Sequence, residues 1–72
     1  MPDFRIIPSI DILRKRDGVR ALEAAFGADA TVEALRAGAE TVRARVAAGE
    51  EVAHAADVIE DMTRAALAGR SR

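Results

Sequence analysis

The chain has 72 residues, a formal net charge of −1 and no cysteine. This length fits one domain, and the missing cysteines exclude a disulfide scaffold and a zinc site built on thiolates. No apolar run approaches the roughly 20 residues that span a bilayer, and the first residues show no signal peptide. We therefore expect a single domain over residues 1–72, located in the cytoplasm, with no membrane partner.

Two short helices are predicted in the first third of the chain. Ser9 is a good N-cap and Ile10 and Leu13 share one face, so a first helix should begin there and end near Arg16. Asp17 and Gly18 form a turn signal, in which Asp17 can cap the next helix. Three apolar residues then follow at helical spacing before a glycine stop: Val19, Leu22 and Phe26, with Gly27.

A long helix is predicted over residues 29–48, closed by Gly49. Its apolar stripe consists of Val32, Leu35, Ala39, Val42 and Val46. Gly38 lies at the edge of this stripe, although glycine inside a helix costs about 1 kcal/mol relative to alanine. Close approach of another helix is the favoured reason for it, and close approach of a ligand is the alternative.

A second long helix is predicted over residues 50–68, followed by Gly69. Its stripe consists of Val52, Ala55, Ile59, Met62, Ala66 and Leu67. No strand alternation or internal repeat is present. The expected fold class is therefore all-α, a small four-helix bundle of two short and two longer helices.

Residues that could perform chemistry are sparse. His54 is the only histidine, and Glu50 and Asp57 would lie one turn to either side of it on the predicted helix. One imidazole and two carboxylates make a weak metal site, so a solvated helix face is the favoured interpretation. We expect no catalytic residue and no metal in this chain.

The basic residues are the best functional candidates. Four of them crowd one short segment and two more lie seven residues apart, about 10.5 Å along one side of the long helix. The candidate RNA-binding set is Arg14, Lys15, Arg16, Arg20, Arg36 and Arg43. Arg36 and Arg43 could instead pair with Glu33 and Glu40 on their own helix. Stacking on bases is not expected, because Phe4 and Phe26 are the only aromatic residues and both are predicted to be buried.

The order of several motifs resembles a known family. The chain reads Ile7-Pro8-Ser9-Ile10-Asp11-Ile12-Leu13, then Ala25-Phe26-Gly27, then Val32-Glu33-Ala34-Leu35-Arg36, then Arg43 and Gly49. This order resembles the N-terminal domain of bacterial selenocysteine synthase, L-seryl-tRNA(Sec) selenium transferase, over about residues 5 to 69. The first motif is the most distinctive. Arg14 departs from the family, which commonly has a second leucine there.

The resemblance implies a non-catalytic domain that binds tRNA(Sec) in selenocysteine biosynthesis. Its other implied partners are the catalytic domain of the same polypeptide and further copies in a homo-oligomer. Pyridoxal phosphate would belong to that catalytic domain, with no cofactor in the present chain. The alternatives are a helical protein-interaction or oligomerisation module, which would use the apolar stripes of the long helices, and a DNA-binding helix-turn-helix. The acidic segment from Glu50 to Asp61 is expected to point away from RNA.

Overall fold

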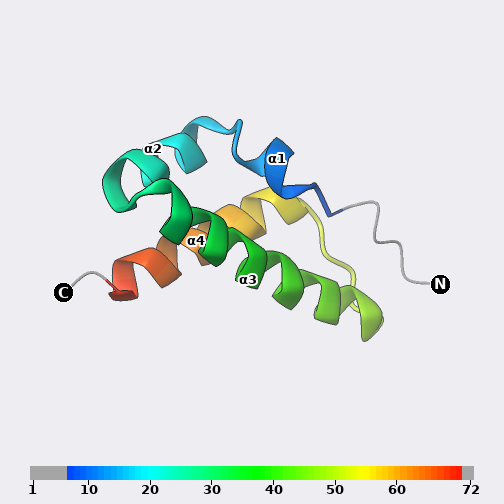
Figure 1. Cartoon of the computed structure of the whole chain (residues 1–72). Helices are drawn as coiled ribbons and strands as arrows, with labels where there is room; N and C mark the ends of the chain where they lie inside the picture. Colours follow the sequence, from blue (N-terminus) through cyan, green and yellow to red (C-terminus); the bar gives the residue numbers. More distant parts are fainter. Residues whose placement is uncertain (1–6, 71–72) are drawn as a thin grey trace.

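The computed structural model of the chain describes residues 7–70, which form an all-helical bundle (Figure 1). Helix α1 spans Ile10–Leu13, α2 spans Asp17–Phe26, α3 spans Ala28–Ala47 and α4 spans Ala55–Arg70. No strand occurs within this range. The predicted fold class, with two short and two longer helices, is confirmed.

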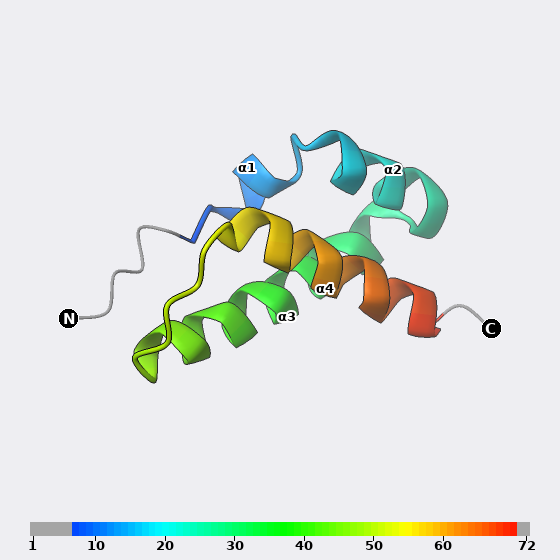
Figure 2. The same cartoon turned by 180° about the vertical axis from the view of Figure 1, so that it is seen from behind.

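The two long helices form the main packing unit. Figures 1 and 2 show α4 returning along α3 in the opposite direction, with the α1–α2 pair lying across one side of both. The α1–α2 turn therefore lies next to the first half of α4, although some 40 residues separate the two segments in sequence. This arrangement brings the basic segment and the acidic segment together.

The helix boundaries follow from local chemistry. The Ser9 hydroxyl accepts a hydrogen bond from the backbone N–H of Ile12 at 3.3 Å, as expected of an N-cap. Gly27, with φ of 94°, ends α2 and directly precedes α3. Few residues other than glycine adopt this conformation at low cost. The predicted cap at Asp17 is wrong, because Arg16 is the N-cap of α2 and Asp17 is its first helical residue.

The predicted start of the last helix is also wrong. The segment between Gly49 and His54 is not helical, and α4 begins at Ala55, five residues later than predicted. His54 has φ of +54°, in the left-handed region, so it cannot continue a right-handed helix backward. Its carbonyl accepts the first bond of α4, from the N–H of Val58. Glu50, His54 and Asp57 therefore do not share a helix face.

The core joins all four helices. Its fully buried members include Leu13 of α1, Val19 of α2, Leu35 of α3 and Ile59 of α4. A smaller cluster of Leu22, Ala34 and Leu67, with half-buried Phe26 against it, closes the other end of the bundle. Phe26 is thus less buried than predicted, and Phe4 lies outside the described residues.

Two threonines occupy core positions that the hydrophobic pattern missed. Thr31 and Thr63 are both fully buried. Each hydroxyl donates to the carbonyl one turn earlier, Thr31 to Gly27 at 2.8 Å and Thr63 to Ile59 at 2.7 Å. Burial therefore leaves no hydroxyl unpaired. On α4, Thr63 takes the inward position, whereas Ala66, predicted to be in the stripe, is exposed.

Gly38 marks the close approach of α3 and α4. A Cβ at this position would lie 3.3 Å from Ile59 Cγ2 and 3.5 Å from the Ile59 carbonyl oxygen. The favoured explanation of this glycine, contact with another helix, is confirmed. A side chain larger than a methyl group would force the two long helices apart.

Leu35→Ala should lower the free energy of unfolding by about 2–5 kcal/mol, because it empties a fully buried position at the centre of α3. Urea denaturation followed by circular dichroism measures this change. Ile12→Ala is the matched control, since Ile12 is 57 % exposed and should lose less than about 1 kcal/mol. Equal losses in the two variants would contradict the assigned core.

Candidate nucleic-acid interface

The first group of basic residues lies in the turn between α1 and α2. The backbone N–H groups of Lys15 and Arg16 donate to the carbonyls of Ile12 and Leu13, each at 3.1 Å, which shapes the turn. Leu13 and Val19 are fully buried on either side. The polar residues between these two anchors are consequently held at the surface. Arg14 and Lys15 are exposed there, Arg20 is exposed on α2, and Arg16 is half-buried.

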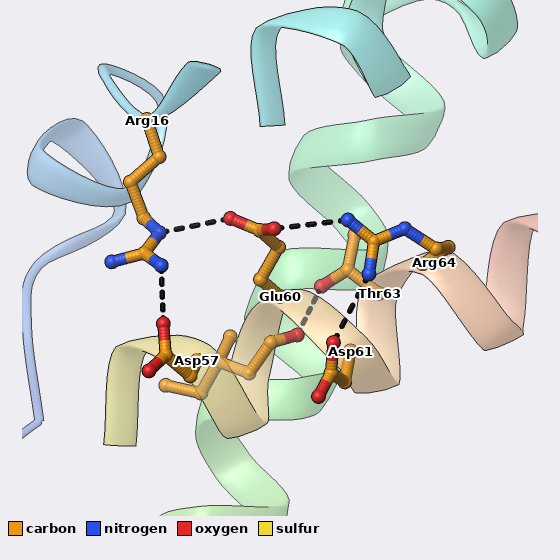
Figure 3. Close-up of polar contacts among 7 residues, drawn as sticks. Arg16, Asp57, Glu60, Asp61, Thr63 and Arg64 are labelled. Carbon is orange, nitrogen blue, oxygen red and sulfur yellow. Dashed lines mark hydrogen bonds and ion pairs between the residues drawn. The ribbon is translucent and has the colours of Figure 1, made fainter. Parts of the chain in front are cut away.

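Arg16 is engaged in a network of ion pairs with α4. Its Nε donates to Glu60 Oε1 at 2.9 Å and its Nη2 donates to Asp57 Oδ1 (Figure 3). The other Glu60 oxygen accepts from Arg64 at 2.9 Å, and Arg64 also pairs with Asp61 at 3.0 Å. Glu60 thus joins two arginines, one at the start of α2 and one on its own helix. We assign Arg16 and Arg64 a structural role.

Gly18 allows the Glu60 carboxylate to lie against the first turn of α2. A Cβ at position 18 would overlap Glu60 Oε2 and lie 2.8 Å from Glu60 Cδ. The N-terminal end of a helix carries partial positive charge, which favours a carboxylate there. The absence of a side chain at position 18 is therefore part of what lets Arg16 and Glu60 pair.

Arg14 pairs with Glu23 of α2 through two hydrogen bonds. Its Nε and Nη2 donate to the two carboxylate oxygens at 3.3 and 3.1 Å. The Arg14 guanidinium lowers the pKa of the Glu23 carboxyl, mainly through these hydrogen bonds. The pKa of Glu60 is lowered in the same way, first by the hydrogen bond from Arg16. Both carboxylates are therefore held in the charged form.

Two shallow surface hollows meet at Arg14. The first is lined by Asp11, Arg14, Lys15, Arg20 and Glu23. The second is lined by Arg14, Ala28, Asp29, Val32, Glu33 and Arg36. Since Arg14 lines both hollows, Arg36 of α3 adjoins the basic residues of the α1–α2 turn. The sequence treated these as two separate basic groups.

The basic residues differ in how far their charges are already neutralised. Arg43 pairs with Glu40 at 3.1 Å, as the sequence allowed. Among residues 7–70, no hydrogen bond or ion pair engages the side chains of Lys15, Arg20, Arg36 or Arg45. Lys15, Arg20 and Arg36 are therefore the cations of the candidate set that are most available to an anionic partner. We call these three residues, together with Arg14, the basic face.

Part of the acidic segment, which we expect to point away from RNA, contacts one member of the candidate RNA-binding set. Asp57 and Glu60 contact Arg16 directly, although Glu50 and Glu51 remain exposed in the loop before α4. This pairing was invisible in the sequence because its members lie 41 and 44 positions apart. Three acidic side chains of α4 are consequently paired with Arg16 and Arg64.

Neither a metal site nor a membrane-spanning helix is found in the described residues. Within them, no group of three or more histidine, cysteine, aspartate or glutamate side chains is placed to hold a metal ion. None of the helices they form has both the length and the apolar character needed to cross a membrane. Comparison with known protein families, with curated proteins and with solved structures finds no match to this chain.

Gly18→Ala should be less favourable to stability in the wild type than in a Glu60→Ala background, by about 1 kcal/mol, because the new methyl group displaces the Glu60 carboxylate from Arg16. In a Glu60→Ala background the same change should be neutral or stabilising, since alanine favours a helix over glycine by up to about 1 kcal/mol. A double-mutant cycle of urea denaturation curves measures the coupling. An equal effect of Gly18→Ala in both backgrounds would show that the pairing of Glu60 with Arg16 does not depend on the space at Gly18.

The pKa values of Glu23 and Glu60 are lowered from 4.5, the ordinary value of a glutamate. The free energy of unfolding should therefore fall as the pH drops below about 4.5. A lowered pKa in the folded state means that the stabilisation is complete above the unfolded-state value and is lost as protons bind at lower pH. The difference in unfolding free energy between wild type and Glu60→Gln should therefore narrow as the pH falls through this range. A difference that stays constant with pH would contradict the pairing of Glu60.

Proposed function

We propose that this chain is a non-catalytic tRNA(Sec)-binding domain that corresponds to the N-terminal domain of a bacterial selenocysteine synthase. The proposal combines the order of the sequence motifs with the position of the basic face. The motifs have clear structural roles: Ser9 caps α1, Gly27 separates α2 from α3, and Leu35 lies in the core. These roles support the fold that the resemblance implies, and the exposed cations supply the binding.

The observation that carries the proposal is the grouping of exposed cations around Arg14. Lys15 and Arg20 border one side of it and Arg36 borders the other, in two adjoining shallow hollows. Arginine and lysine at such positions bind backbone phosphates and 2′-hydroxyls, which are presented by the shape of a folded RNA. Contacts of this kind position an RNA and carry little sequence information.

The ion pairs of α4 make this binding compatible with a net charge of −1. Asp57, Glu60 and Asp61 are each paired with an arginine, so their repulsion of an approaching phosphate is partly cancelled. Lys15, Arg20 and Arg36 form no ion pair within the described residues, although Asp11, Glu23, Asp29 and Glu33 line the same two hollows. An approaching phosphate therefore meets these three cations while the repulsion from α4 is reduced.

Pyridoxal phosphate, the cofactor of the implied parent enzyme, does not fit the residues of this chain. Lys15 is the only lysine, and it lies exposed in a turn between two arginines. A Schiff base needs an amine that is neutral and shielded from water. We therefore assign cofactor binding and the transfer reaction to a separate catalytic domain of the same polypeptide.

A protein-interaction module is the second candidate, and one side chain favours it. Ile12 is 57 % exposed, the one large hydrophobic side chain that is so exposed within the described residues. The apolar stripes of the long helices are used mainly within the chain, because Leu35, Val42 and Ile59 are fully buried in its own core. Sedimentation of the wild type and of Ile12→Glu tests this candidate: self-association that the substitution abolishes would favour it.

Arg20→Glu should weaken binding of transcribed tRNA(Sec) by about tenfold or more and make the salt dependence less steep by about one unit, because one phosphate contact is lost. Arg45→Glu is the matched control. Arg45 is likewise exposed and unpaired among residues 7–70, but it lies in the last turn of α3, away from both hollows. Its reversal should change affinity much less.

A fluorescence titration at several salt concentrations measures both quantities, with duplex DNA as a competitor. Equal losses in the two variants would mean that only overall charge matters. Equal affinity for duplex DNA would contradict recognition of RNA shape and favour a general polyanion binder. Melting curves of both variants establish that the fold is retained.

A further inference from the structure

The Arg14–Glu23 pair lies at the centre of the basic face. Arg14 lines both hollows, and Glu23 lines the first of them together with Lys15 and Arg20. The pair is arranged as a fork, with Nε and Nη2 each facing one carboxylate oxygen at 3.3 and 3.1 Å. A guanidinium binds two oxygens of a phosphate group with the same edge and nearly the same spacing.

We infer that Glu23 occupies a phosphate-binding position on Arg14 in the free protein, and that an RNA backbone phosphate displaces it on binding. The site is the Nε–Nη2 edge of Arg14, and its ligand class is a phosphodiester. This inference rests on the proposed binding of tRNA and adds to it one defined contact, together with an internal competitor for that contact.

The exposure of the pair makes the exchange feasible. The Arg14 side chain is 44 % exposed, whereas Glu23 is only 18 % exposed. An ion pair that water reaches contributes little to folding, so its loss is a small penalty. The pair links the end of α1 to α2 within one corner of the molecule and does not join to the Arg16–Glu60 network. Opening it would therefore leave the main packing intact.

The neighbouring charges favour a phosphate over the carboxylate. Lys15 and Arg20 border the same hollow as Arg14, and neither forms an ion pair within the described residues that a phosphate would have to break. Asp11 and Glu23 are the acidic residues of that hollow, and Asp29 and Glu33 are those of the adjoining one. Glu23 is the member of this set that pairs with Arg14, so its removal both frees the fork and lowers the repulsion.

Arg16 is a less accessible phosphate-binding position than Arg14. Arg16 also binds carboxylates through Nε and Nη2, but these come from two residues of α4, and Glu60 is additionally held by Arg64. A phosphate would have to displace two carboxylates from Arg16, one of which Arg64 also holds. At Arg14 it has to displace one carboxylate, to which no other side chain among residues 7–70 donates a hydrogen bond.

The test is the affinity of Glu23→Gln for transcribed tRNA(Sec), measured by fluorescence titration over a range of salt. We expect binding about three- to tenfold tighter than wild type, with a salt dependence steeper by about one unit. Asp61→Asn is the matched control, because it also removes one negative charge and one hydrogen bond to an arginine, but on α4. It should change the affinity less than twofold.

A further pair of variants tests the two-bond contact between Arg14 and Glu23 directly. Arg14→Gln should weaken binding, and adding Glu23→Gln to it should restore much less affinity than Glu23→Gln gains in the wild type. The same gain in both backgrounds would overturn the inference, because it would show that Glu23 acts only as a nearby charge. Equal gains from Glu23→Gln and Asp61→Asn would overturn it for the same reason.

The outcomes separate this inference from the proposed function. Wild-type binding that Glu23→Gln leaves unchanged overturns the inference and leaves the proposed function standing. Absence of binding by both proteins overturns both. Binding by Glu23→Gln alone supports the inference and contradicts tRNA binding by the wild-type domain in isolation.

Discussion

The contact between Gly38 of α3 and Ile59 of α4 sets the geometry of the whole bundle. Without a side chain at position 38, the Ile59 methyl group and carbonyl approach the α3 backbone closely. The long helices can then bury Leu35 and Ile59 between them and still leave room for α1 and α2 to pack across one side (Figures 1 and 2). The ion pairs of Arg16 with Asp57 and Glu60 depend on this placement of α4.

One such contact is the meeting of opposite charges at the start of α2. The position of α4 brings Glu60 beside Gly18 and within hydrogen-bond distance of Arg16. Glu60 then binds Arg16 and Arg64 together, so the short α2 helix is held to α4 by charge as well as by Val19 in the core. A small domain with a limited apolar core benefits from such a link, since its total stability is only a few kcal/mol.

The same ion pairs also decide which cations remain available to bind an anionic partner. Arg16 and Arg64 are used inside the fold, whereas Lys15, Arg20 and Arg36 face solvent around Arg14. Arg14 is intermediate between the two groups, because it forms an ion pair but its side chain is exposed. The proposed binding of RNA and the proposed displacement of Glu23 both follow from this difference in partners and exposure.

The sequence by itself determined the helical class, the number of helices and most of the core. Periodic apolar residues identify Leu35, Val42 and Ile59 as buried, and Ser9 and Gly27 mark helix ends, because these signals act within a few residues. The same local reasoning missed Thr31 and Thr63, whose hydroxyls are satisfied by carbonyls of their own helices. It also placed the start of α4 too early, because apolar spacing continues through Val52 whereas the backbone at His54 turns into the left-handed region.

Only the tertiary structure decided how the candidate site is built. The sequence grouped Arg14, Lys15, Arg16 and Arg20 as equivalent, since they are close along the chain. In the fold, Arg16 pairs with carboxylates of α4, Arg14 pairs with Glu23, and Arg36 lines the second hollow together with Arg14. The ion pairs of Arg16 join residues 41 and 44 positions apart, so they depend on how α4 packs on α3 at Gly38 and Ile59, which no local pattern encodes.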